Sequence, residues 1–320
     1  MKKTLWFFAA ALAALGAVFW GMERRERAGA RSPSGFVDAR PDDLVRLRVD
    51  YLGDSVTLIR EGRRWMTTGD RFPADTARLR RVLDGVLGLQ RRETVSAEGV
   101  TDADLAPYGL DSASARRVEW TLASGEVIRV LLGRTSGIDF GSVFWKPAGE
   151  PGAWRTPGTF VWDVSSRPKD WKDTTLFPRF APEDIARLDV EWREPDGASV
   201  RYVVTRDGDS DSAFRVEDPG AGRIEPARRD AAAALFTHAA QFKIDDFLSG
   251  FDAAAAGAAL DAPVMIVRIG LKSGVTHVVT AGAPVDGLYR YIRHPTHPDP
   301  VRVFAWRFKY FRKRAGELQE

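Results

Sequence analysis

The chain has no cysteine among its 320 residues. Disulfides, zinc–thiolate sites, iron–sulfur clusters and thiol nucleophiles are therefore excluded together. Histidine is also scarce, with four in the whole chain. The sequence lacks a glycine-rich phosphate loop ending in Lys-Ser or Lys-Thr, and it lacks the patterns Gly-x-Gly-x-x-Gly and Gly-x-Ser-x-Gly. These absences remove most of the short motifs by which an enzyme is recognised, so we expect no catalytic residue and no cofactor.

Neither sign of charge dominates, since 47 Lys and Arg stand against 44 Asp and Glu. The basic residues are scattered singly, whereas a nucleic-acid footprint would gather them on one face, so no nucleic-acid partner is expected. Hydrophobic residues make up 44% of the chain and aromatic residues 11%. That composition and length are enough for two folded domains.

An N-terminal segment has the properties of a membrane anchor. Residues 4–22 carry no charge, and at about 1.5 Å per residue they match one bilayer crossing. Trp6 and Trp20 lie near its two ends, where indole rings prefer the headgroup region, and the charged residues 23–27 end the segment.

The alternative to an anchor is a cleavable signal peptide. The apolar segment is longer than the roughly 7 to 15 residues of a signal peptide, and the best small-residue site, Ala28-Gly29-Ala30, lies beyond the charged cluster. We therefore predict an uncleaved single-pass anchor in the cell inner membrane. Residues 1–3 would be cytoplasmic, 4–22 transmembrane and 23–40 a linker, with the C-terminal domain periplasmic.

The rest of the chain contains two copies of one pattern. Residues 41–49 return as residues 182–190, with a paired acid and the apolar alternation of a strand kept in both. A predicted hairpin follows in each copy and ends at Trp65 or Phe214. A proline then opens a predicted helix, and the apolar stripe Leu79, Val82, Leu83, Val86, Leu87 recurs 153 residues later as Ala232, Leu235, Phe236, Ala239, Ala240.

Two further strands around Ser124-Gly125 and Ser273-Gly274 complete each copy, and aromatic strands at 160–162 and 303–306 close it. The sequence therefore predicts an α+β fold with two tandem copies of a β-hairpin, helix and antiparallel-sheet unit behind one transmembrane helix. The predicted copies span residues 41–175 and 176–312, and a C-terminal tail spans 313–320. Each sheet should cover its apolar face with its own helix.

Several of these features resemble one bacterial family. They are the N-terminal anchor, a strand pair ending in Gly-x-x-Trp at 62–65, the helix start Phe72-Pro73-Ala74-Asp75, and Tyr108-Gly109-Leu110-Asp111. In the second copy, Ala258-Ala259-Leu260-Asp261 replaces the last pattern. The chain resembles the family known as domain of unknown function 4340. The resemblance implies a membrane-attached envelope protein, in some cases associated with gliding-motility-type transporter systems, and it supplies no catalytic residues.

Candidate catalytic and metal sites are each better explained by local structure. Ser55 in Gly-Asp-Ser-Val resembles an esterase nucleophile block, but no histidine has the required Asp three residues before it. His294 and His297 could hold a metal with Asp299, although three prolines in seven residues indicate a stiff loop. Asp207–Asp211 resembles a calcium loop without its turn glycine. We expect no metal site, while the sequence leaves weak binding at the last two places open.

The paired acids that precede a strand in each copy, Asp42-Asp43 and Glu183-Asp184, would point to opposite faces. Neither pair naturally forms a two-carboxylate catalytic site. We expect them to have a structural role at the start of each copy.

Ten tryptophans remain, several of them beside Arg or Lys, which is typical of both cores and binding platforms. We take Trp145, Trp154 and Trp171 as a candidate binding surface. Trp65, in contrast, should be a core residue that packs beneath the helix after Pro73, against Leu79, Val82 and Leu83.

The sequence thus favours a non-enzymatic, membrane-anchored envelope binding or scaffold module. Its expected partner is another envelope protein, as an accessory of a transporter or assembly complex. The alternative is a hydrolase acting on envelope glycan or lipid through carboxylates that are distant in sequence.

If the anchor is uncleaved, the native protein should retain its N-terminal thirty residues. The intact mass measured after detergent extraction is expected to include Met1–Ala30, apart from loss of the initiator methionine. A mature chain that begins at Arg31 would show that the segment is a signal peptide.

Overall fold

The computed structural model describes residues 36–37, 39–96, 101–137, 141–207, 213–248, 253–285 and 287–319. The predicted membrane segment 4–22 lies outside these residues. Within the described ranges, no helix is long and apolar enough to cross a membrane.

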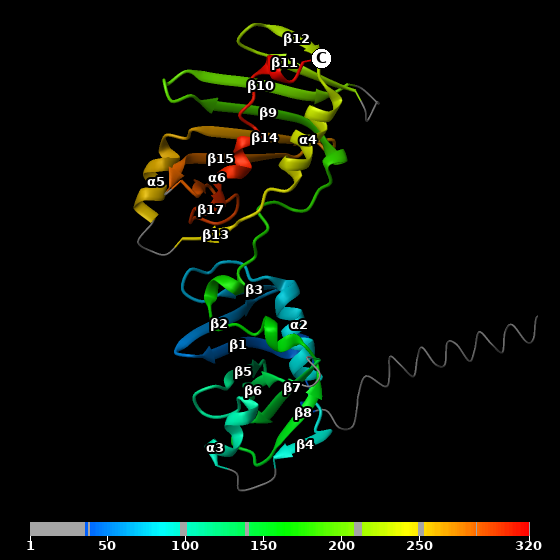
Figure 1. The fold of residues 1–320 in the computed structure, drawn as a ribbon, viewed down its shortest axis with the longest axis vertical. Helices are drawn as coiled ribbons and strands as arrows, with labels where there is room; N and C mark the ends of the chain where they lie inside the picture. The colour runs from blue at the N-terminus through cyan, green and yellow to red at the C-terminus, as the bar shows by residue number, and fades with distance from the viewer. Residues whose placement is uncertain are drawn as a thin grey trace, which may run out of the picture. The chain divides into compact units, whose positions relative to one another are not determined.

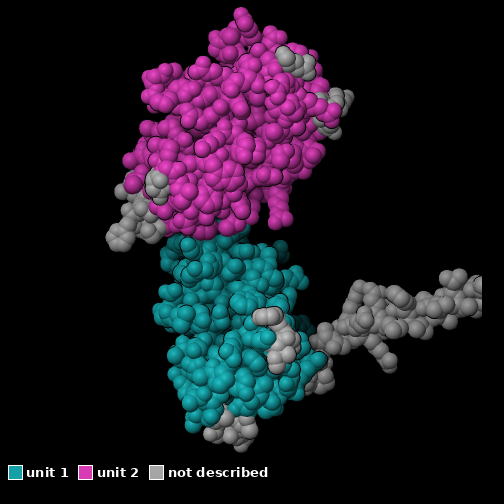
Figure 2. All heavy atoms as spheres, in the orientation of Figure 1, with its two compact units in different colours: residues 1–173 teal, residues 174–320 magenta. Residues whose placement is uncertain are grey.

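The chain divides into two compact units, coloured separately in Figure 2. Unit 1 ends at Asp173 and unit 2 begins at Thr174. The division therefore lies two residues before the boundary expected from the sequence pattern. Each unit combines an antiparallel sheet with short helices, as the α+β prediction requires.

Unit 1 contains an eight-stranded sheet with the order β3-β2-β1-β5-β6-β7-β8-β4 (Figure 1). All of its described pairings are antiparallel. Its strands are β1 (Leu44–Tyr51), β2 (Asp54–Glu61), β3 (Arg64–Thr67), β4 (Glu93–Ser96), β5 (Arg116–Leu122), β6 (Val127–Thr135), β7 (Ser142–Pro147) and β8 (Ala153–Pro157).

Unit 2 contains a nine-stranded sheet with the order β12-β11-β10-β9-β14-β15-β16-β17-β13. This order matches that of unit 1 strand for strand, with β12 added at one edge. The additional strand β12 is an exposed edge strand. The strands are β9 (Ile185–Arg193), β10 (Ser199–Arg206), β11 (Phe214–Asp218), β12 (Arg223–Pro226), β13 (Asp246–Phe247), β14 (Met265–Leu271), β15 (Thr276–Val285), β16 (Tyr289–Ile292) and β17 (Val301–Phe304).

A twelve-residue helix with a buried stripe accompanies each sheet: α2 (Thr76–Leu87) in unit 1 and α4 (Arg229–Ala240) in unit 2. The stripe prediction is confirmed for four of its five residues in each helix: Leu79, Val82, Leu83 and Val86 are buried in α2, and Ala232, Leu235, Phe236 and Ala239 in α4. The fifth residue, Leu87 or Ala240, is half-buried. Shorter helices are α3 (Asp102–Leu105), α5 (Ala253–Asp261) and α6 (Ala305–Lys309).

The two main helices begin later than predicted. Each starts three residues beyond the proline that was expected to open it. In unit 1, the carboxylate of Asp75 accepts hydrogen bonds from the backbone N–H groups of Ala77 and Arg78 and so caps α2. Pro73 instead forms a bridge with Met66. A side-chain cap thus determines where α2 begins.

The predicted closing strands are only partly present. Phe160–Asp163 forms a 3₁₀ helix, and in unit 2 the chain leaves β17 at Phe304 to enter α6. These apolar segments are too short for their spacing to distinguish a strand from a helical turn.

The predicted linker, 23–40, and the predicted C-terminal tail, 313–320, are both partly folded. The N–H of Phe36 donates to the carbonyl of Leu89 at 3.0 Å, and its ring contacts Trp145, so the linker ends before this residue. The tail after residue 312 belongs to unit 2. Leu318 is buried, and its carbonyl accepts the N–H of Arg228 at 2.8 Å.

Trp65 is buried in the core of unit 1 together with Leu79, Val82 and Leu83, as predicted. Its ring meets that of Trp120 edge to face, with centroids 6.4 Å apart. We expect Trp65→Ala to lower the free energy of unfolding by about 3–5 kcal/mol, because the substitution leaves a cavity. The measurement is chemical denaturation of the full chain.

Trp162→Ala is the matched control, because Trp162 is 66% exposed in the same unit. Its effect should stay within about 0.5 kcal/mol. Equal effects of the two substitutions would contradict the core role of Trp65.

Candidate functional site

Two of the three tryptophans proposed as a binding surface are core residues. Trp145 and Trp171 are fully buried. Their indole N–H groups donate to Thr156 Oγ1 at 2.8 Å and to the carbonyl of Ser165 at 2.6 Å. Neither ring is accessible to a partner, because each fills an inward position and has its polar atom satisfied internally.

The third, Trp154, is partly buried. It contacts Trp145, with ring centroids 5.4 Å apart, and lies 5.1 Å below the guanidinium of Arg91. Its position beside Trp145 makes it an extension of the core rather than a platform.

The exposed tryptophans follow the last strand of each unit in chain order. Trp162 lies in the 3₁₀ helix after β8, and Trp306, 45% exposed, lies in α6 after β17. Sequence reasoning treated both as strand residues. Their immediate neighbours gave no signal for this, since Trp145-Lys146 has the same succession of an aromatic and a charged residue and Trp145 is buried.

Trp306 is part of a row of contacting rings on unit 2, in which the first two contacts are stacked and the third is edge to face. The ring centroids of Tyr289 and Phe304 are 4.8 Å apart, those of Phe304 and Trp306 are 6.5 Å apart, and Tyr310 follows 6.2 Å from Trp306. His238 of α4 stacks on Tyr310 at 3.5 Å. With the neighbouring Leu288, these residues form what we call the aromatic surface.

The aromatic surface is open to solvent and held in place by charge. Leu288 is 51% exposed and Tyr310 42% exposed. The guanidinium of Arg307 lies 4.7 Å from the ring centroid of Trp306, and two hydrogen bonds of 2.8 Å tie it to Asp245. A cation fixed over an exposed indole gives a surface that suits protein or glycan ligands.

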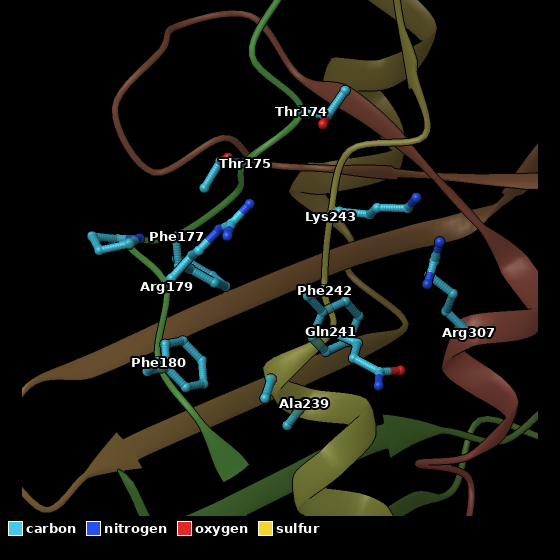
Figure 3. A pocket seen from close by; sticks show the side chains of 12 residues that line it. Thr174, Thr175, Phe177, Arg179, Phe180, Ala239, Gln241, Phe242, Lys243 and Arg307 are labelled. Atoms are coloured by element: carbon cyan, nitrogen blue, oxygen red, sulfur yellow. The ribbon is translucent and has the colours of Figure 1, made fainter. Parts of the chain in front are cut away.

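A pocket of about 540 Å³ shares Arg307 with this surface (Figure 3). It lies between the segment that carries Arg179 and Phe180 and the segment that carries Gln241 and Phe242. Its lining includes three basic side chains and no carboxylate. Chemically, it offers aromatic faces and cations but no general acid or base of the carboxylate type.

His277 stands behind this pocket on β15. Its ring stacks against Phe177 at 4.6 Å and Phe180 at 5.4 Å, and both phenylalanines line the pocket. Burial lowers the pKa of His277 below its usual value of 6.5, and it also lowers the pKa of His238 in the aromatic surface. Both imidazoles therefore favour the neutral form.

The esterase-like Ser55 has the role of a hairpin residue. It faces Asp50 across the β1–β2 ladder and hydrogen-bonds the carboxylate of that residue. Ser55 therefore has a structural role next to the hairpin turn, as expected.

The side chains of the two loop histidines accept hydrogen bonds from the backbone of their own loop. Nδ1 of His294 accepts the N–H of Thr296 at 3.2 Å, and Nδ1 of His297 accepts the N–H of Asp299 at 3.1 Å. No group of three or more potential ligand residues occurs in the described parts of the chain. Of the calcium-loop candidate, only Asp207 is described, and it pairs with Arg215 at 3.0 Å.

The paired acids have the predicted structural role. Asp43 accepts the N–H of Arg40 at 3.0 Å, and Asp184 accepts the N–H of Ala181 at 2.7 Å. Each carboxylate thereby caps a 3₁₀ helix that leads into the first strand of its unit.

The chain was compared with known protein families, curated proteins and solved structures. The family model described as domain of unknown function (DUF4340) matches residues 65–259, more than half of the chain and parts of both units. The chain belongs to this family. No curated protein and no solved structure shows a significant match to it. Membership in the DUF4340 family brings no reaction or ligand with it, so any function has to be argued from the residues.

Acidification should destabilise unit 2 through His277. Because its folded-state pKa is lowered, the unfolded chain binds a proton at higher pH than the folded chain. The stability that unit 2 gains from keeping His277 neutral is complete above about pH 6.5. It is lost as the pH falls through the folded-state pKa. When the pH is lowered from about 8 to 5, the melting temperature of the His277→Phe variant should therefore fall less than that of the unaltered chain. Parallel losses in the two proteins would contradict this assignment.

Proposed function

We propose that this DUF4340 protein is a non-enzymatic binding module of the cell envelope that docks a protein partner through the aromatic surface of unit 2. The observation that carries the proposal is the exposure of Leu288, Trp306 and Tyr310 on neighbouring segments, with the rings of Trp306 and Tyr310 in edge-to-face contact. Single exposed apolar residues are ordinary, but a contiguous group is typical of an interaction site.

The composition of the aromatic surface supports a protein partner. Trp, Tyr and Arg are the residues most enriched among those that dominate binding energy at protein interfaces. Here Trp306 is restrained by its edge-to-face contact with Tyr310, Tyr310 is stacked on His238, and Arg307 is held by Asp245. Little conformational entropy would be lost when such a surface meets a partner.

We further propose that units 1 and 2 are tandem copies of one α+β unit. The support is their matching strand order, their twelve-residue helices with equivalent buried stripes, and the capped 3₁₀ helices before β1 and β9. An exposed tryptophan after the last strand is a further shared feature. Trp162 therefore gives unit 1 a smaller counterpart of the aromatic surface.

The charge-free segment 4–22 supports the proposal of an inner-membrane anchor that holds both units in the periplasm. A partner would then be another envelope component, such as part of a transporter or assembly complex. The alternative, a hydrolase of envelope glycan or lipid, would need two carboxylates in one cleft. The 540 Å³ pocket beside the aromatic surface has none in its lining, which favours binding over hydrolysis.

Photo-crosslinking from the edge of the aromatic surface tests the proposal. A photoreactive amino acid at Leu288 of the full-length protein should give one discrete crosslinked product in native membranes. Trp306→Ala should reduce that product about tenfold or more, because removal of an interface aromatic typically weakens binding by about 2 kcal/mol.

Ile224→Ala is the matched control, since Ile224 is also exposed on unit 2 but lies on the edge strand β12. It should leave the crosslink unchanged. The proposal is wrong if no product forms, or if Trp306→Ala and Ile224→Ala give equal yields.

A further inference from the structure

A second, smaller pocket lies at one end of the sheet of unit 2. It has a volume of about 280 Å³ and is bordered by Trp192 of β9, Met265 of β14 and Arg290 of β16. Arg312 of the C-terminal segment borders it as well. Most of its other walls are apolar, including Val264 and Pro284.

Arg290 is a buried cation without an acidic partner. Arg290 is only 8% exposed. Nη1 donates to the carbonyl of Gly282 at 2.9 Å, the guanidinium lies 5.7 Å from the ring centroid of Phe308, and Nε has no hydrogen-bond partner among the described residues. An unpaired buried charge is strongly unfavourable, so its presence calls for a partner.

Two other basic side chains among the described residues, buried Lys172 and half-buried Arg307, have such partners. Lys172 in unit 1 forms an ion pair with Asp70, and Arg307 is held by both carboxylate oxygens of Asp245. Among the described residues, no carboxylate lies within ion-pair distance of Arg290. Arg290 differs from Lys172 and Arg307, because its guanidinium faces a backbone carbonyl and an aromatic ring instead of a carboxylate.

The fold itself does not need an arginine at this position. Arg290 pairs with Pro284 just past an irregularity in the β15–β16 ladder. The corresponding ladder of unit 1, β6–β7, has an irregularity at the same place, and there Thr135 pairs with Val143. Val143 is fully buried. An apolar side chain thus satisfies the same site in the other unit.

The surroundings of the pocket favour an anion. Trp192 lines the pocket, and its indole N–H is buried without a hydrogen-bond partner in the described structure. An adjoining hollow, which shares Trp192, Glu194 and Arg312 with the pocket, also carries Lys309, Arg314 and Glu317. Together the two linings hold five basic and two acidic side chains, and one of the acids, Glu194, already pairs with Arg312 at 3.1 Å.

We propose that this pocket binds a small organic acid through its carboxylate, with Arg290 as the charged partner and Trp192, Val264 and Met265 around the apolar part. A single buried guanidinium matches a monoanion, and its planar donors fit a carboxylate. The volume, just below the usual range for ligand pockets, fits a short apolar chain. This ligand site is independent of the aromatic surface and of the proposed protein partner.

Methyl NMR of the full-length protein in detergent can test the proposal. The chain has four methionines, of which Met265 borders the pocket and Met66 lies on β3 of unit 1. Hexanoate should shift the Met265 methyl signal saturably and leave Met66 unchanged. Hexanamide has the same shape without the charge. Its affinity should be lower than that of hexanoate by about tenfold or more, because it leaves the guanidinium unpaired.

Arg290→Leu should abolish the hexanoate-dependent shift, and Arg187→Leu on the exposed part of β9 should not. The proposal is overturned if hexanoate and hexanamide act equally, if Arg290→Leu still binds hexanoate, or if no shift of Met265 occurs. A response to inorganic phosphate alone would also overturn the assignment to a carboxylate. If Arg290→Leu does not fold, the comparison of hexanoate with hexanamide on the unaltered chain decides the question.

Discussion

Burial of one face of each antiparallel sheet beneath a single twelve-residue helix is the constraint on which both units depend. In unit 1 the strand residues Leu47, Leu58 and Val130 share one core with the stripe of α2. Neither a two-stranded hairpin nor a short helix is stable alone, so each needs the other. The strand order, the capped 3₁₀ starts and the position of the main helix all serve to bring these two apolar surfaces together.

That constraint also determines where functional residues are available. Residues on the buried face cannot meet a partner, whereas the turns that leave the sheet after its last strand can. Trp306 and Tyr310 lie on such a turn in unit 2, and Trp162 lies on the corresponding turn in unit 1. Arg290 is the exception, because it places a charge on the core side of the sheet where Val143 stands in the other unit.

Sequence periodicity predicted the two main helices, α2 and α4, and most strands, because their apolar spacing reports directly which face is buried. It did not predict the candidate site. Trp145 and Trp306 are both aromatic residues followed by a base, and nothing in their neighbours distinguishes an inward strand position from the first turn of a helix. The difference depends on where β17 ends, and a helical turn needs only a few residues to begin.

The sequence by itself determined the absence of thiol chemistry, the charge balance, the α+β pattern and the buried stripes of α2 and α4, because composition and local periodicity are properties of neighbouring residues. Only the tertiary structure decided which tryptophans are exposed and that Arg290 lacks a carboxylate partner. Both depend on contacts between residues far apart in the chain. Phe308, for example, lies beside Arg290 only after the C-terminal segment has folded onto the sheet.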